Sequence, residues 1–392
     1  MAADANEGGT LSCLAQGSSE SCTSPGESAY GSAASVCELS LALNRLDLDV
    51  HVLALSCVDE DAAAGFARLE AAGVSVTRLP IRTPSGWMRP QPAYRIGDIA
   101  RIRKALQQLR PDLVHCHESL GLAAVHASGR GRTVPTVATI HGATGKNPLY
   151  EALFRWLCAG VDARIVLTQR DLRSSEASGD SAVLLRNAVD PAWWAAAHEA
   201  AADLRAELGI PREALVIGLV GRLSPEKGGE PFLHAYARSQ ALRGAQVHVL
   251  VAGAGPRERR LRALCDRLGI TPTVRFTGRC RDMPRVYRTV DLVALPSRRE
   301  TQPMVLLEAL ACGVPVVATA AGEVPVMLAN GAGTVFPIGG LHEMISGIES
   351  LIASKEQRDT LSRRGRSRVE SAYSVVDLAR DIVERVYEPL LP

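Results

Sequence analysis

Short apolar runs alternate with longer amphipathic stretches along almost the whole chain. Runs such as residues 49–56 and 247–252 are rich in Val, Leu and Ala, and stretches with helical spacing follow them at residues 62–72 and 257–268. Buried parallel strands have this nearly continuous apolar character, and strands that alternate with helices form βαβ units. The pattern therefore predicts an α/β protein with parallel sheets.

The apolar runs fall into two sets, separated by an irregular segment at residues 183–191 that resembles a hinge. In the first set, strands are expected at residues 11–16, 49–56, 74–79, 113–117, 137–141 and 163–168, and helices at 33–44, 62–72 and 96–109. In the second set, strands are expected at residues 214–219, 247–252, 273–277, 291–295 and 314–319, and helices at 230–241, 257–268 and 304–312.

The length of the chain supports two domains. A single hydrophobic core stops growing beyond about 250–300 residues, and this chain has 392. We therefore expect a first domain at residues 1–190 and a second at residues 191–371, each with its own parallel sheet. Residues 372–392 follow as a terminal segment with an amphipathic helical pattern.

The composition excludes several classes of protein. Forty-four Lys and Arg against 42 Asp and Glu leave a net charge of +2, which is too balanced for general nucleic-acid binding. Nine dispersed cysteines without a C-x-x-C pair are typical of reduced thiols in the cytosol. The chain shows neither a signal-peptide pattern nor an apolar run of membrane-spanning length. We therefore expect a cytoplasmic protein.

The segment at residues 291–319 combines features of a ligand site. An apolar strand ends at Leu295, Glu300 follows in the loop, and Pro303 lies where a first helical residue is expected. Glu308 lies eight residues after Glu300, inside an apolar helix. This order brings two carboxylates and a helix N-terminus to the carboxyl edge of a parallel sheet, where ligands bind. Sugar hydroxyls are suitable partners for the carboxylates.

A second group of candidate residues lies where the second half of the chain begins. A strand ends at Gly221, and Arg222 and Lys227 follow before the next helix. Arginine binds phosphate oxygens with a planar fork and lysine supplies a point charge. The spacing is not that of a Walker loop. Solvated surface charges are the alternative, but the Glu300–Glu308 pair in the same half favours a phosphate site.

Two further patterns admit different interpretations. The sequence HCHE at residues 115–118 could suggest zinc, but only His141 is a plausible further ligand, so a buried polar or substrate-facing role is favoured. His141 itself ends an apolar strand at a sheet edge, and a histidine bonded to loop backbone is the alternative. Residues 253–258, GAGPRE, lack the last glycine of a dinucleotide fingerprint, so a plain strand-to-helix turn is favoured.

Two basic segments, residues 95–110 and 275–299, suggest a possible contact with anionic lipid at the inner face of a membrane. A solvated helix face is the alternative for the first segment. A cleft charged for a nucleotide is the alternative for the second.

Several of these motifs together resemble the retaining GT-B glycosyltransferases of family 4, also called group 1. The resemblance covers nearly the whole chain and rests on DLVHCHE (112–118), HG (141–142), RNAVD (186–190), GRLSPEKGG (221–229), AGAGP (252–256), FTGRCRD (276–282) and the Glu300-x₇-Glu308 motif followed by ALACGVPVVAT. It implies two Rossmann-like, doubly wound domains that face each other across a cleft. The first would bind the acceptor, the second the nucleotide-sugar donor, and residues 372–392 would cross back to the first.

The resemblance also implies a role for each matching residue. Arg222 and Lys227 would hold the donor diphosphate, Glu308 the ribose hydroxyls, and Glu300 the hydroxyls of the transferred sugar. The donor would also be contacted by Thr301, Gln302, Pro303, Met304, Arg279, Cys280 and Gly31, the last placed in the loop after the first strand. His141 would contact the donor sugar near the reacting carbon, and together with Glu300, Arg222 and Lys227 it would form the catalytic set.

The implied reaction moves a hexose-type sugar from a nucleotide-diphosphate sugar to an acceptor hydroxyl, with retention by front-face attack and without a metal or cofactor. A UDP-sugar is favoured as donor and GDP-mannose is the main rival. The chain departs from the family at Thr301-Gln302, where glycine-containing sequence is common, at Ala188, and in the long loop GSSESCTSPGESAYGS. A non-catalytic nucleotide-sugar-binding protein or an epimerase of the same fold is the alternative.

Overall fold

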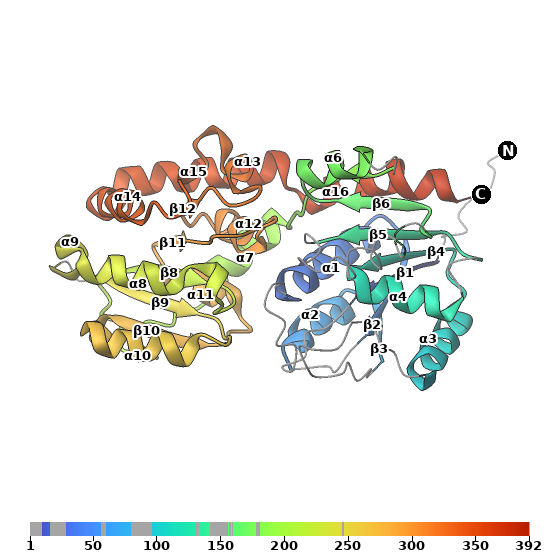
Figure 1. Ribbon diagram of the computed structural model, residues 1–392, viewed down its shortest axis with the longest axis horizontal. Coiled ribbons are helices and arrows are strands. Elements are labelled where there is room, and N and C mark those ends of the chain that lie inside the picture. The colour runs from blue at the N-terminus through green and yellow to red at the C-terminus, as the bar shows by residue number, and fades with distance from the viewer. Residues whose placement is uncertain are drawn as a thin grey trace. The chain divides into compact units, whose positions relative to one another are not determined.

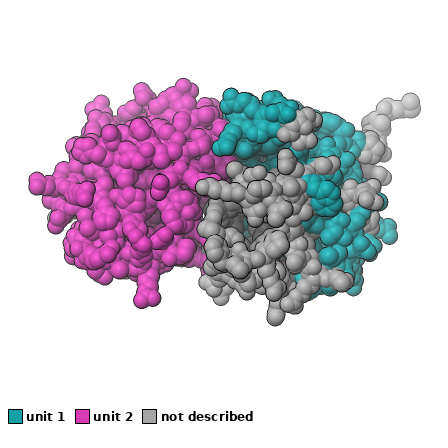
Figure 2. All heavy atoms as spheres, viewed as in Figure 1, with its two compact units in different colours: residues 1–187, 375–392 teal, residues 188–374 magenta. Residues whose placement is uncertain are grey.

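The computed structural model describes residues 10–15, 29–55, 60–79, 96–129, 133–141, 156, 158, 160–177, 181–244 and 247–391. The chain divides into two compact units (Figure 2): residues 1–187 together with 375–392 form unit 1, and residues 188–374 form unit 2. Each unit is built around one parallel sheet, as the alternation of apolar runs predicts.

Unit 1 contains a seven-stranded parallel sheet in the order β3-β2-β1-β4-β5-β6-β7. Its strands are β1 (Thr10–Ala15), β2 (Asp49–Leu55), β3 (Ser75–Leu79), β4 (Leu113–His117), β5 (Thr136–Ile140), β6 (Ala163–Val166) and β7 (Val183–Leu184). Its helices are α1 (Ala29–Asn44), α2 (Glu60–Ala71), α3 (Ile96–Leu109), α4 (Glu118–Ser128), α6 (Gln169–Ala177) and α16 (Val375–Ile382). A core that includes Leu53, Ile102 and Val114 joins the central strands to α3.

The C-terminal segment belongs to unit 1, where α16 packs against α1. The sequence pattern predicts one amphipathic helix over this segment. The structure instead has α16, a π-helical turn η5 (Val383–Tyr387) and a 3₁₀ turn η6 (Glu388–Leu390). Val386 and Tyr387 of η5 are buried, so the segment contributes to the interior of the unit.

Unit 2 contains a six-stranded parallel sheet in the order β10-β9-β8-β11-β12-β13 (Figure 1). Its strands are β8 (Leu215–Val220), β9 (Val247–Ala252), β10 (Val274–Gly278), β11 (Leu292–Leu295), β12 (Val316–Thr319) and β13 (Thr334–Phe336). Its helices are α7 (Pro191–Ala200), α8 (Gly229–Arg238), α9 (Gln240–Gly244), α10 (Glu258–Leu268), α11 (Met283–Thr289), α12 (Met304–Ala311), α13 (Val324–Met327), α14 (Leu341–Ala353) and α15 (Lys355–Ala372). Single 3₁₀ turns lie at η2 (Pro225–Lys227), η3 (Thr271–Thr273) and η4 (Ala329–Gly331).

In the core of unit 2, side chains from one face of the sheet pack against helices α8, α10 and α14. Phe232 and Tyr236 of α8 are fully buried against Ile217 and Val249 of the neighbouring strands β8 and β9. Helices α7, α11, α12 and α15 make a second group of packed helices. Because β8 pairs with β11 in parallel, both strands end at the same edge of the sheet, and the loops that follow them start side by side.

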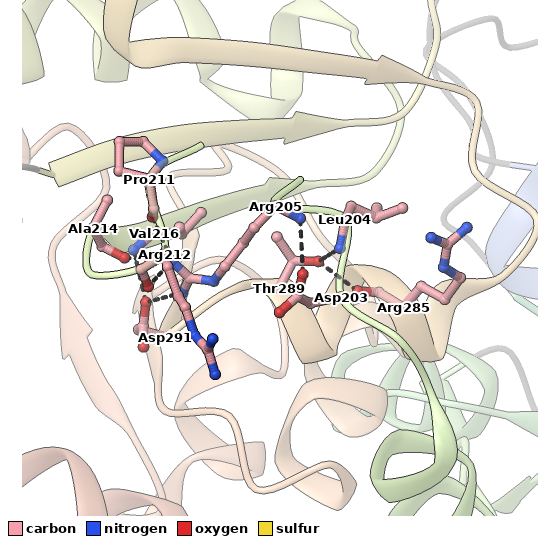
Figure 3. A network of polar contacts seen from close by, with 10 residues as sticks. All are labelled: Asp203, Leu204, Arg205, Pro211, Arg212, Ala214, Val216, Arg285, Thr289 and Asp291. Carbon is pink, nitrogen blue, oxygen red and sulfur yellow. Dashed lines mark hydrogen bonds and ion pairs between the residues drawn. The ribbon is translucent and has the colours of Figure 1, made fainter. Parts of the chain in front are cut away.

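The opposite, amino-terminal end of this sheet is held by a polar network around Asp291 and Arg205 (Figure 3). The carboxylate of Asp291 accepts a hydrogen bond from the backbone N–H of Val216 at 2.8 Å and one from the Arg205 guanidinium at 3.0 Å. Arg205 also donates to the carbonyl of Ala214. Nearby, the hydroxyl of Thr289 accepts from the N–H of Leu204 at 2.8 Å. The network ties residues 204–216 to the start of β11.

Removing this carboxylate is expected to destabilise unit 2. The substitution Asp291→Ala leaves a strand N–H and one N–H group of the half-buried Arg205 guanidinium without the acceptor that Asp291 provides, which costs about 2–3 kcal/mol of unfolding free energy. Urea unfolding followed by circular dichroism measures the loss. Asp359→Ala is the matched control, because its ion pair with Lys355 is exposed and should leave the unfolding midpoint unchanged. Equal midpoints for the two variants would contradict the prediction.

Candidate functional site

The loops after β8 and β11 hold the charged residues predicted for the donor site. Lys227 ends the 3₁₀ turn η2 that follows β8, and Glu300 lies in the loop between β11 and α12. The Lys227 ammonium donates to both carboxylate oxygens of Glu300, at 2.8 and 3.0 Å. The side chain of Glu300 is 7% exposed and that of Lys227 is 20% exposed. The structure therefore brings together two residues that are 73 positions apart in the sequence.

Close backbone packing positions this ion pair. Gly228, directly after Lys227, has φ +72°, and a Cβ at this position would overlap the carbonyl oxygen of Pro296. The N–H of Arg298 donates to the carbonyl of Glu226 at 2.7 Å. Because both loops touch through backbone atoms, there is little room for either to move without the other.

The loop after β12 supports Glu300 from another side, and the sequence analysis did not include it in the site. Gly322 has φ +56°, and a Cβ there would overlap the carbonyl oxygen of Glu300. The next residue, Glu323, donates its N–H to the carbonyl of Thr301 at 3.1 Å. Its side chain is buried, and its Oε2 has no hydrogen-bond partner among the described residues. Three residues separate Glu323 from the end of β12, and no local pattern in the sequence marked it.

The second carboxylate of the predicted pair, Glu308, lies inside α12 and is 6% exposed. The hydroxyl of Tyr287, from α11, donates to Glu308 Oε2 at 2.7 Å. Burial, and next the neighbouring Glu308, raise the pKa of Tyr287 well above its usual value, so the phenol remains a hydrogen-bond donor at neutral pH. Nothing in the sequence spacing pointed to Tyr287, because it belongs to a different helix.

The other residues of the β11–α12 segment that were predicted to contact the donor lie around the start of α12. Pro303 is the N-cap of the helix, so the prediction that it is the first helical residue was one position early. Gln302 and Met304 on either side of it are buried, and Thr301 is half-buried. The N-terminus of α12 thus follows the loop that carries Glu300, which is an arrangement that favours anions.

Three predicted donor contacts lie in loops that glycines hold together at the same sheet edge. Arg222 is half-buried and follows β8 after Gly221, while Arg279 and Cys280 directly follow β10. Gly253 donates its N–H to the carbonyl of Gly278 at 2.9 Å. A Cβ on Gly253, which has φ +144°, would overlap the carbonyl oxygen of Gly221. Residues 253–257 link β9 to α10, as expected for a plain strand-to-helix turn.

Two predicted residues lie in unit 1 and are described with it. Gly31 was expected in a loop, but it is the third residue of α1, which begins at Ala29. Small polar residues at the start of this helix carry no apolar periodicity, so the sequence pattern places the helix start too late. The loop residues 16–28 and Gly142, which also entered the sequence argument, lie outside the described residues.

His141 directly follows β5 and is joined to a buried histidine of β4. Its Nε2 lies 2.9 Å from Nδ1 of His117, within hydrogen-bond distance. His115, two residues earlier on the same strand, bonds Thr139 through Nε2 at 2.7 Å and Tyr387 through Nδ1 at 2.6 Å. Burial lowers the pKa of His115 to about 3 and that of His141 to about 4, and lowers the pKa of His117 well below its usual value. All three rings are therefore neutral at neutral pH.

Acidification is expected to weaken unit 1 through these histidines. Because their folded-state pKa values are lowered, the unfolded chain binds more protons between about pH 4 and 6.5, so stability falls as the pH falls. The substitution His141→Gln removes one such ring. When the pH is lowered from 6.5 to 5, the unfolding free energy of the variant, measured with urea, should therefore fall by about 1–2 kcal/mol less than that of the wild type. An equal fall in both proteins would contradict this.

The described residues contain no group of three or more His, Cys, Asp or Glu side chains arranged to hold a metal ion, and this includes His115, Cys116 and His117. Within the same residues, no helix is long and apolar enough to cross a membrane. Several arginines of the basic segments have partners inside the protein: Arg103 donates to the carbonyl of Ser128, and Arg275 to the carbonyl of Leu208. Membrane contact through these segments remains a prediction.

Two family profiles match the chain. The profile "Glycosyltransferase Family 4" matches residues 30–193, and "Glycosyl transferases group 1" matches residues 201–368. Among curated proteins, a D-inositol 3-phosphate glycosyltransferase of Corynebacterium jeikeium is 42% identical over 135 residues, which cover 32% of each chain. One of Saccharomonospora viridis is 31% identical over 288 residues, which cover 66% of each chain. The matched region is thus less than two thirds of either relative's length.

Solved structures with a similar fold cover nearly the whole chain. Anabaena Alr3699/HepE in complex with UDP-glucose has a TM-score of 0.75 at 22% identity, covering 97% of this chain and 100% of that one. Sucrose-phosphate synthase of Thermosynechococcus elongatus has a TM-score of 0.74 at 17% identity, covering 97% and 99%. At such identities these likenesses establish the fold alone.

Proposed function

Because the chain belongs to the group 1 and family 4 glycosyltransferases and has their GT-B fold, we propose that it is a retaining hexosyltransferase. It takes a hexose-type sugar from a nucleotide-diphosphate sugar and transfers it to an acceptor hydroxyl. The observation that carries the proposal is the bidentate ion pair between Lys227 and Glu300 at the carboxyl edge of the unit 2 sheet. This pair offers a cation for phosphate beside a carboxylate for sugar hydroxyls.

Cleavage of the glycosyl–phosphate bond builds negative charge on the departing nucleotide diphosphate. In the proposed reaction Lys227, together with Arg222, stabilises that charge. Fixed donors of this kind typically contribute about 10²–10³-fold to the rate. Since these cations come from the chain, the proposed transfer proceeds without a divalent metal. Addition of EDTA should therefore leave the rate unchanged.

The two carboxylates have different proposed partners. Glu300 keeps the cation beside the donor and accepts hydrogen bonds from the transferred sugar. Glu308 lies deeper, where Tyr287 holds one of its oxygens, and it accepts hydrogen bonds from the ribose. Thr301, Gln302, Pro303 and Met304 place the start of α12 beside the sugar and phosphate. In these roles both carboxylates lie beside hydroxyl groups, and neither carboxylate binds the phosphate.

We favour a UDP-sugar as donor, since the similar Anabaena structure is a complex with UDP-glucose. The curated relatives are named D-inositol 3-phosphate glycosyltransferases, so a phosphorylated cyclic polyol is the first acceptor to test. Glycan and glycolipid hydroxyls follow as further acceptor classes. Retention of the anomeric configuration follows from front-face attack, in which the leaving phosphate accepts the proton of the acceptor hydroxyl.

Thermal unfolding against UDP-, GDP-, ADP- and TDP-sugars tests donor binding. A ligand at 100 times its Kd adds about 2.7 kcal/mol of stability, which raises the melting temperature of a domain of this size by about 5–11 °C. Nucleotide release with inositol 3-phosphate then tests transfer, and NMR of the product's anomeric proton tests retention. Binding without release for any acceptor class would favour the alternative, a non-catalytic nucleotide-sugar-binding protein. No shift with any donor would overturn the proposal.

A further inference from the structure

The family resemblance implies a contact between His141 and the donor sugar, but it implies no role for the buried histidine bonded to His141. His117 ends β4 and is 2% exposed. Its Nδ1 faces Nε2 of His141 at 2.9 Å, and its own Nε2 is buried without a hydrogen-bond partner among the described residues. A buried polar atom without a partner calls for a physical reason. Here the reason lies in which nitrogen carries the proton.

The two rings share one proton between the facing nitrogens. If His117 carried its proton on Nε2, an N–H would be buried without an acceptor among the described residues, at a cost of about 1–3 kcal/mol. With the proton on Nδ1, only a lone pair is left unpaired, and buried unpaired acceptors are tolerated more often than buried unpaired donors. Nδ1 of His117 is therefore the donor and Nε2 of His141 the acceptor.

This assignment determines the proton position on His141. A neutral imidazole carries one proton, and a ring whose Nε2 accepts a hydrogen bond carries it on Nδ1. Burial lowers the pKa of His141 to about 4, so the neutral form prevails at neutral pH. His141 then offers an N–H donor at Nδ1, while its only basic nitrogen is occupied by His117.

From this geometry we infer that His117 is a positioning residue, which holds His141 in the Nδ1–H form so that it meets the donor sugar as a neutral hydrogen-bond donor rather than as a base. The inference rests on the proposed function for its sugar ligand. The hydrogen bond and the proton position it implies belong to the folded chain alone.

The surroundings of His117 prevent its ring from turning over. The ring of His115 lies against it, with ring centroids 4.3 Å apart and 30° between the planes. His115 is itself bonded at both nitrogens, to Thr139 of β5 and to Tyr387 of η5. A flipped His117 would place carbon opposite His141 and lose the hydrogen bond. Because β5 and η5 hold His115 in place, His115 in turn holds the His117 ring, and His117 fixes the orientation of His141.

The proton position is measured directly by ¹⁵N NMR of the histidine side chains, because protonated and unprotonated ring nitrogens differ strongly in chemical shift. The His141 signals are assigned by comparison with His141→Gln. We expect the proton on Nδ1 in the wild type. Two amide variants form a matched pair: His117→Asn places an N–H donor near the position of Nδ1, whereas His117→Gln places its amide near Nε2. The Asn variant should keep the Nδ1–H form, and the Gln variant should lose it.

Kinetics complete the test. With the best donor and acceptor, His117→Gln should lower kcat by about 10- to 100-fold with KM little changed, as expected when a bound group is misplaced. His117→Asn should keep most of the wild-type kcat. If both variants melt at the same temperature, a merely structural role for His117 would not predict this difference in kcat. A proton on Nε2 of His141 in the wild type, or unchanged kcat in the Gln variant, would overturn the inference.

The two proposals can fail separately. If no donor is turned over, the proposed function fails, and the NMR comparison of the Asn and Gln variants alone decides whether His117 controls His141. If transfer occurs but the proton on His141 is insensitive to residue 117, the proposed function stands and the positioning role is wrong.

Discussion

Replacing Lys227 by alanine is expected to lower kcat for sugar transfer by about 10²–10³-fold, the usual effect of removing one charge-stabilising donor from a transition state. The reason is that Lys227 carries the positive charge beside Glu300, and charge on the diphosphate develops as the sugar leaves. The rate of nucleotide release at saturating donor and acceptor measures the effect. Melting temperature is recorded in parallel, because the variant leaves the buried Glu300 carboxylate unpaired.

The chain offers a matched control for this substitution. Lys355 is also in unit 2, but its side chain is 78% exposed and pairs with Asp359 within α15. Lys355→Ala should therefore leave kcat unchanged. If Lys227→Ala instead raised only KM, the lysine would bind ground state and transition state equally. The proposed stabilisation of the leaving group would then be wrong.

Replacing Gly228 by alanine is expected to damage both stability and activity. Its φ of +72° costs an alanine about 1 kcal/mol, and the new Cβ would overlap the backbone carbonyl of Pro296. Relieving that overlap adds about 1–3 kcal/mol and moves apart the loops that hold Lys227 and Glu300. Urea unfolding and nucleotide release measure the two effects.

The substitution Gly269→Ala measures the cost of a positive φ alone, without a steric overlap of the new Cβ. Gly269 caps α10 with φ +65°, and apart from its two chain neighbours no described residue has an atom within 4 Å of the position its Cβ would take. This variant should therefore lose about 1 kcal/mol and keep its activity. Equal losses of stability in the two variants would show that the contact with Pro296 relaxes without cost, contrary to the expectation.

Much of the candidate donor site could be predicted because it depends on order along the chain. The carboxyl ends of parallel strands lie at one edge of a sheet, so the residues after β8 and β11 are expected at the same edge once both strands are recognised. That reasoning placed Lys227 and Glu300 in the same half of the chain, but only the structure shows that their strands are neighbours. The same reasoning could not show that they form an ion pair, since two turns with different backbone paths determine where each side chain ends.

Other features had no local signal. Helix α15 is predominantly polar, with Gly365 and Val369 as its buried residues, so its sequence resembles a solvated segment. Gly31 was placed in a loop because the first turns of α1 lack apolar spacing. Glu323 entered the site only through the backbone contact of its loop with Thr301.

Alternating apolar runs were sufficient to predict two parallel α/β sheets and the sheet edge that carries the candidate donor residues, because strand and helix periodicity is a local property of the chain. Which side chains touch was settled by sheet order and by packing between distant segments. Tyr387 reaches His115 across 272 positions and Tyr287 reaches Glu308 from another helix. The proton position on His141 is likewise a property of the packed structure, because it depends on a ring from the neighbouring strand.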